Sequence, residues 1–169
     1  KDNREYNPSS FWSLPKEVDS DQLLSDKILE RMAQDVSFRV RNNQELIRTK
    51  GNEPIAAVAK YDMAQCYRHG WGVSINYKES IKLYDESAKM GHAGACYELA
   101  RLYLQGHTLM DIKIDLSLSE YYSKLGLDKC QKIGSDMDFL NYKNSDYVPQ
   151  LNGLLKTIEF CKWSNQNRF

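Results

Sequence analysis

The chain has 169 residues, of which 41 % are hydrophobic, so it is long enough for one domain with an apolar core and too short to favour a second independent domain. Its 23 basic and 23 acidic residues cancel, which argues against a protein that gathers nucleic acid or an anionic membrane through its overall charge. No segment approaches the roughly 18 consecutive apolar residues of a membrane helix, so we expect a soluble protein without direct membrane insertion.

The first 18 residues contain Pro8 and Pro15 and show no apolar periodicity. We therefore expect residues 1–18 to form a flexible N-terminal arm. The chain begins at Lys1 and not at a methionine, which is typical of a processed product or of a piece of a longer protein.

Residues 19–53 are expected to form divergent N-terminal helices. Asp19 and Ser20 are suited to cap the first of them, because their side-chain oxygens accept hydrogen bonds from the free amides of a first turn. An apolar stripe at helical spacing follows, made of Leu23, Leu24, Ile28 and Met32. A second, weaker stripe, expected to end at Gly51 and Asn52, contains Val36, Val40, Leu46 and Ile47.

The next helix is expected to begin at Pro54, since proline is tolerated in a first turn, and to reach about Arg68. Its sequence over residues 59–70, AKYDMAQCYRHG, matches residues 95–106, ACYELARLYLQG, at an offset of 36 positions. Both segments are followed by a loop and a second tyrosine-bearing helical pattern. A helix–loop–helix unit with this period predicts a solenoid.

The residues of each unit suit this architecture. Ala64 and Ala100 are small where two helices approach, whereas large aromatic rings fill the seam at Tyr67, Tyr84, Tyr103 and Tyr122. Gly70 and Gly72 are expected to end the first helix and let the chain reverse. Asn76, followed by Glu79, has the spacing of a capping box and predicts where the second helix begins.

The pattern resembles the Sel-one-like repeat, a relative of the tetratricopeptide repeat. In the first unit the resemblance rests on Ala59, Tyr67, Gly70, Gly72, Val73, Tyr84, Ala88 and Gly91. In the second it rests on Ala95, Leu99, Tyr103, Gly106, Tyr121, Tyr122 and Lys124. The second unit lacks Gly-x-Gly-Val, and its span from Gly106 to Tyr122 is two residues longer than the span from Gly70 to Tyr84, so the register inside that loop stays open.

Two repeats over residues 54–130 are fewer than the roughly three that such arrays usually need, so the flanks are expected to contribute. Residues 131–169 are expected to hold a C-terminal capping helix, because four leucines and isoleucines recur there at helical spacing: Leu151, Leu154, Leu155 and Ile158. The predicted fold is all-α, a short right-handed α-solenoid of helix–loop–helix repeats with divergent helical ends.

The resemblance implies an adaptor or scaffold within a multiprotein complex, because members of this family mostly act in that way. Stacked helix pairs also curve, so that the first helices line an inner face suited to a protein or peptide. The candidate protein-binding residues are the outward positions of the first helices, namely Lys60, Asp62, Gln65, Arg68, Glu98, Arg101 and Leu104. The alternative is that they are ordinary solvated helix residues that form ion pairs one turn apart. Glu98 and Arg101, three residues apart, have the spacing for such a pair.

A repeat-fold hydrolase or a zinc-binding protein that uses Cys and His residues is the competing class. Cys66 and His69, and likewise His92 and Cys96, have spacings that place each pair on one helical face, but small buried cysteines explain them as well. No nucleophile, base and orienting group can be assembled, so we predict no catalytic residue, no metal and no cofactor. Nucleic-acid binding is not favoured either, since the only basic patch, Arg39, Arg41, Arg48 and Lys50, is typical of the solvated side of a helix.

The four cysteines, Cys66, Cys96, Cys130 and Cys161, are spread through predicted helices. This spacing favours buried free thiols and hence a cytoplasmic protein. Relatives with disulfides tie the two helices of one unit, which here would need a cysteine near Ala88 or Leu125, and neither has one. Bridged cysteines would instead indicate a secretory or mitochondrial intermembrane-space protein.

Overall fold

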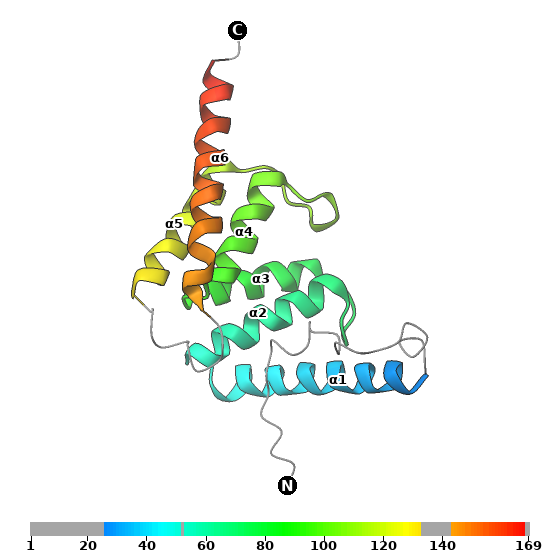
Figure 1. Cartoon of the computed structure of the whole chain (residues 1–169). Coiled ribbons are helices and arrows are strands. Elements are labelled where there is room, and N and C mark those ends of the chain that lie inside the picture. The colour runs from blue at the N-terminus through cyan, green and yellow to red at the C-terminus, as the bar shows by residue number, and fades with distance from the viewer. Residues whose placement is uncertain (1–25, 52, 133–142, 168–169) are drawn as a thin grey trace.

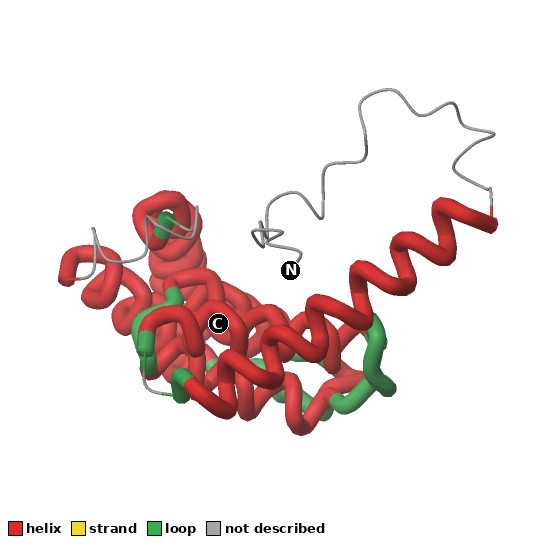
Figure 2. Tube along the Cα trace, turned by 90° about the horizontal axis from the view of Figure 1, so that it is seen from below, coloured by secondary structure: helices red, strands yellow, loops and turns green. Residues whose placement is uncertain are grey.

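The computed structural model describes residues 26–51, 53–132 and 143–167, and these residues are helical almost throughout, joined by short loops (Figures 1 and 2). The elements in chain order are α1 (Asp26–Thr49), α2 (Pro54–His69), α3 (Tyr77–Lys89), α4 (Ala93–Gln105), the 3-10 helix η2 (Thr108–Met110), α5 (Leu116–Lys132), the 3-10 helix η4 (Asn144–Tyr147) and α6 (Val148–Gln166). Each α-helix packs on the next one along the chain. The predicted all-α repeat solenoid is confirmed.

The helix α1 is longer and more continuous than the sequence suggested. We expected two helical patterns between residues 19 and 50, but α1 runs without a break from Asp26 to Thr49. The reason is that no glycine or proline lies between these residues, so nothing interrupts the hydrogen-bond ladder. The predicted arm, the predicted caps, and the stripe of Leu23, Leu24, Ile28 and Met32 lie outside the described residues or side chains.

The helices α2 and α3 form the first unit, and α4 and α5 form the second. Within each unit a buried serine of the second helix donates a hydrogen bond to an alanine carbonyl of the first: Ser80 Oγ to Ala64 at 2.8 Å, and Ser119 Oγ to Ala100 at 2.7 Å. Such contacts need the two backbones to lie close together, which explains why the first helices carry alanine there. The predicted role of Ala64 and Ala100 at a close approach is confirmed.

These hydrogen bonds also settle the register of the second loop. The two alanines are 36 positions apart, whereas the two serines are 39 positions apart, so the second loop is three residues longer than the first. The helix caps agree: Asn76 Oδ1 accepts from the Glu79 N–H, and Asp115 Oδ1 accepts from the Leu118 N–H. Tyr122 therefore matches Leu83 of the first unit, and Tyr84 matches Ser123.

The two loop glycines have different reasons to be glycine. Gly70 ends α2 in the left-handed conformation, with φ 74°, as predicted. Gly72 also has a positive φ of 68°, and a Cβ atom there would lie 2.7 Å from Val36 Cγ1 of α1. The first loop is thus pressed against the helix that precedes the repeat.

The part of α1 from Val36 onward takes the place of the second helix of a preceding unit. Val36 and Val40 contact the first loop, just as Tyr77 and Ile81 of α3, the same four residues apart, pack near Met110 and Ile112 of the second loop. In each case a second helix supports the loop of the unit that follows it. The N-terminal flank therefore supplies half a repeat.

At the other end, α6 packs on α5 and α4. Leu151 and Ile158 are buried, as predicted for a capping helix, and Leu151 lies where Gly126 leaves room, since a Cβ on this glycine would come within 2.7 Å of Leu151 Cδ1. Glu120 of α5 binds Lys162 of α6 as well as Lys124. Bonds to these two lysines lower the pKa of Glu120 to about 2, so this carboxylate is charged and links α5 to α6.

Candidate protein-interaction surface

The candidate site is the surface formed by α2 and α4, the first helices of the two units, and we call it the α2–α4 face. Six of the seven predicted residues lie half-buried on these helices: Lys60, Gln65, Arg68, Glu98, Arg101 and Leu104. The seventh, Asp62, is buried. Most of the predicted residues are therefore partly accessible and are ordered by partners within the chain.

Glu98 is the centre of the polar part of this face. One of its oxygens, Oε2, accepts a hydrogen bond from Arg68 Nη1 of α2 at 2.9 Å and another from Arg101 Nη2 of its own helix at 2.7 Å. The side chains of Arg68 and Glu98 are only 13 % and 15 % exposed, whereas that of Arg101 is 28 % exposed. The cluster ties the two units together and leaves Arg101 as its most accessible group.

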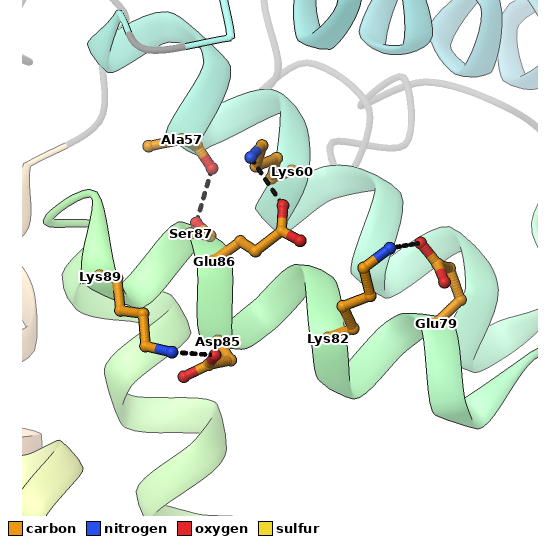
Figure 3. A network of polar contacts seen from close by, with 8 residues as sticks. All are labelled: Ala57, Lys60, Glu79, Lys82, Asp85, Glu86, Ser87 and Lys89. Carbon is orange, nitrogen blue, oxygen red and sulfur yellow. Dashed lines mark hydrogen bonds and ion pairs between the residues drawn. The ribbon is translucent and has the colours of Figure 1, made fainter.

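The flanking polar residues are also held in place. Lys60 Nζ pairs with Glu86 Oε2 of α3 at 2.7 Å, close to the hydrogen bond from Ser87 Oγ to the Ala57 carbonyl (Figure 3). Gln65 Nε2 donates to the Tyr61 hydroxyl at 3.0 Å. Side chains fixed in this way lose little conformational entropy when a partner binds.

Asp62 is not accessible to a partner, and the prediction that it lies on the exposed side of α2 was wrong. Its carboxylate is 7 % exposed and pairs with Arg39 of α1, 2.7 Å from Arg39 Nη2, while Asn43 Nδ2 lies 3.5 Å from the other carboxylate oxygen. The cause is α1, which covers this part of α2. Arg39 is correspondingly buried and not on a solvated basic patch, while Arg48 and Lys50 pair with Glu45 and Glu53.

The α2–α4 face also contains aromatic residues that the sequence analysis did not select as binding residues. Tyr61 and Tyr97 are equivalent positions of the two units, 36 residues apart, and both are half-buried. The Tyr97 ring lies against that of Tyr147 from η4, with centroids 5.9 Å apart. Tyr61 and Tyr97 could have been identified from the sequence, because a tyrosine recurs at the same position of both units. Tyr147 could not, because it lies outside the repeats.

The histidine and cysteine pairs considered for zinc or catalysis have structural roles. Burial raises the pKa of the Cys66 thiol, and it raises that of Cys96 to about 12, so neither is a thiolate at neutral pH. The His69 ring stacks on Trp71 with centroids 4.5 Å apart. In the parts of the chain that the structure describes, no group of three or more His, Cys, Asp or Glu residues is placed to hold a metal ion.

His92 connects the two units. Its Nδ1 accepts a hydrogen bond from the Ala95 N–H at 3.1 Å and so caps α4, and its ring stacks on Tyr61 with centroids 4.3 Å apart. The side chain is fully buried, and this burial lowers the pKa of His92 to about 3. The imidazole is therefore neutral in the folded protein across the physiological pH range.

We expect the protein to lose stability as the pH falls below about 6.5, because His92 then takes up a proton in the unfolded chain but not in the folded one. The stabilisation is fully present above the ordinary histidine pKa, and about 2 kcal/mol of it is lost by pH 5. Urea unfolding at pH 7 and pH 5 measures the loss. His92→Asn, which keeps a capping oxygen without a titrating ring, should reduce the dependence, and equal dependence in both proteins would contradict this role of His92.

Among the described helices, none is both long and apolar enough to cross a membrane.

Comparison with known proteins agrees with these unit boundaries. Residues 57–92 and residues 93–128 each match the family model of the Sel1 repeat. A stretch of 68 residues is 37 % identical to Chitin synthase regulatory factor 2 of Schizosaccharomyces pombe (strain 972 / ATCC 24843). This match covers 40 % of the present chain and 13 % of that protein, so the chain corresponds to a small part of its relative. No solved structure matches the chain.

Proposed function

We propose that the chain is a non-enzymatic adaptor that binds a segment of a partner protein on the α2–α4 face, because residues 57–92 and residues 93–128 each match the Sel1 repeat model. The observation that carries the proposal is the Glu98 cluster, in which arginines of both units share one carboxylate on the face that also carries Tyr61 and Tyr97. Arginine and tyrosine are the residue types that most often dominate binding energy at protein interfaces.

The name of the Schizosaccharomyces pombe relative supports a binding task, since it describes that protein as a regulatory factor. A task of binding another protein agrees with a face made of ordered polar and aromatic groups. In the described residues no observation favours the hydrolase or zinc-protein alternative. We propose that the partner is a separate protein in the cytoplasm.

Arg101→Glu tests this proposal, because Arg101 is the most accessible member of the Glu98 cluster and Glu98 has a second partner in Arg68 of α2. Proteins that copurify with the tagged chain are first identified by mass spectrometry, and the affinity of the purified partner is then measured by calorimetry. We expect the variant to bind at least tenfold more weakly, as expected when a well-ordered interface arginine is lost.

Lys82→Glu is the matched control, since Lys82 is 61 % exposed and lies on α3. It should bind like the unchanged protein. Equal affinity of all three proteins would place the partner elsewhere, and turnover of a substrate by the purified chain would contradict the adaptor role.

A further inference from the structure

The Glu98 cluster contains more positive than negative charge. Its members are Glu98 and Arg101 of α4 and Arg68 of α2, so two guanidinium groups share one carboxylate. Both arginines bind the same oxygen, Glu98 Oε2, which lies 2.9 Å from Arg68 Nη1 and 2.7 Å from Arg101 Nη2. Two positive charges and one negative charge leave the cluster with an excess of one positive charge.

This excess charge lies in a partly buried place. The side chains of Arg68 and Glu98 are 13 % and 15 % exposed, and that of Arg101 is 28 % exposed. Water and salt screen charges less effectively there than at an open surface. An unbalanced positive charge in this position therefore attracts an anion more strongly than an exposed lysine does.

The groups next to the cluster do not supply the missing negative charge. Burial raises the pKa of Tyr84, and the charge of the cluster's carboxylate raises it further, so this hydroxyl is neutral. Burial and the charge of Arg68 lower the pKa of His69, which is therefore neutral at pH 7. Gln105, whose Oε1 lies 3.5 Å from Arg101 Nη1, is uncharged. These neighbours leave the excess charge as it is.

Two carboxylates of the helices around the cluster are already paired. Asp62 of α2 binds Arg39 of α1 at 2.7 Å, and Glu86 of α3 binds Lys60 of α2 at 2.7 Å. Each pair is neutral by itself. Neither carboxylate can therefore balance the Glu98 cluster unless its own ion pair breaks.

We propose that the partner segment on the α2–α4 face carries an aspartate or glutamate whose carboxylate binds the guanidinium group of Arg101. This inference rests on the proposed adaptor function. A carboxylate fits the vacant charge and the shape, because it accepts two parallel hydrogen bonds from one planar guanidinium group. A basic segment would add a further positive charge to the cluster, and like charges brought together at an interface disfavour binding.

Peptides selected from a random phage-displayed library on the immobilised full chain test the inference. We expect the enriched peptides to carry an aspartate or glutamate. A synthetic copy of the most enriched peptide is then compared by calorimetry with a copy in which the corresponding amide replaces the acid. The amide copy should bind roughly tenfold more weakly or worse, because it keeps the shape of the acid but loses the charge.

Both peptides are also measured on Arg101→Gln and on the matched control Lys82→Gln. Each variant loses one positive charge, but Lys82 lies on α3 and is 61 % exposed. Arg101→Gln should bind the acidic peptide roughly tenfold more weakly and should no longer distinguish it from the amide copy. Lys82→Gln should bind like the unchanged protein. Arg101→Lys, which keeps the charge without the planar fork, should recover part of the affinity.

The results separate this inference from the adaptor proposal. Enriched peptides that lack an acid but lose affinity for Leu104→Gln would overturn the inference and leave the α2–α4 face as a binding site. Acidic peptides that bind Arg101→Gln as tightly as the unchanged protein would also overturn it. If every enriched peptide bound Leu104→Gln like the unchanged protein, the binding site would lie elsewhere and both proposals would fail.

Discussion

Replacing Asp62 by alanine is expected to destabilise the protein by about 3 to 5 kcal/mol, because the change leaves the Arg39 guanidinium buried without its carboxylate. Both side chains are 7 % exposed, so water cannot replace the lost partner at the surface. The expected result is a lower midpoint of urea unfolding, together with detachment of α1 from α2. Equilibrium unfolding followed by circular dichroism measures this change.

Two further variants separate the buried charge from other effects. The double change Arg39→Met and Asp62→Leu removes both charges and should restore much of the stability, since an apolar pair of similar size often replaces a buried ion pair without loss. Glu45→Ala breaks the ion pair with Arg48, whose side chain is 72 % exposed, and should cost less than about 1 kcal/mol. If Asp62→Ala lost only little stability, α1 would not cover α2 in solution.

Replacing Tyr84 by alanine is expected to cost a similar amount, about 3 to 5 kcal/mol, because its side chain is among the largest of those fully buried in the chain. It belongs to the core cluster that includes Met63 of α2 and Leu99 of α4, and its ring lies 5.8 Å from that of Tyr61. The cavity would therefore open where both units meet. Thermal unfolding of the purified variant is the measurement.

Tyr121→Ala is the matched control for this prediction, since Tyr121 lies in α5 and is 50 % exposed. Its loss should lower the stability by only a few tenths to about 1 kcal/mol. If Tyr84→Ala were as stable as Tyr121→Ala, α3 would not pack between α2 and α4 as described.

The repeated part of the fold could be predicted from the sequence because each unit is built from local signals. Pro54 begins α2, Gly70 ends it with a left-handed turn, and Asn76 caps α3, so three residues fix the first unit. The second loop was harder to predict from the sequence. It is three residues longer, it lacks the Gly-x-Gly-Val signal of the first loop, and it is closed by a short bridge between His107 and Ile112. Only the hydrogen bonds of Ser80 and Ser119 decide that register.

The candidate site was predicted less well, because it depends on contacts between segments far apart in the chain. Asp62 has an outward position within its repeat, and only the docking of α1 buries it. Tyr147 lies in η4, outside the repeats, so the repeat pattern does not predict that its ring contacts that of Tyr97. Periodicity shows which side of a helix is apolar, but it does not show which neighbour covers the polar side.

Site-specific photo-crosslinking from the α2–α4 face tests the adaptor role most directly. A photoreactive residue is introduced at Leu104, which is half-buried on α4, and in a second protein at Lys78, which is exposed on α3. With the copurified partner added, we predict a covalent complex from position 104 and none from position 78. A complex that forms from position 78 alone, or from neither position while binding persists, would contradict a partner site on the α2–α4 face.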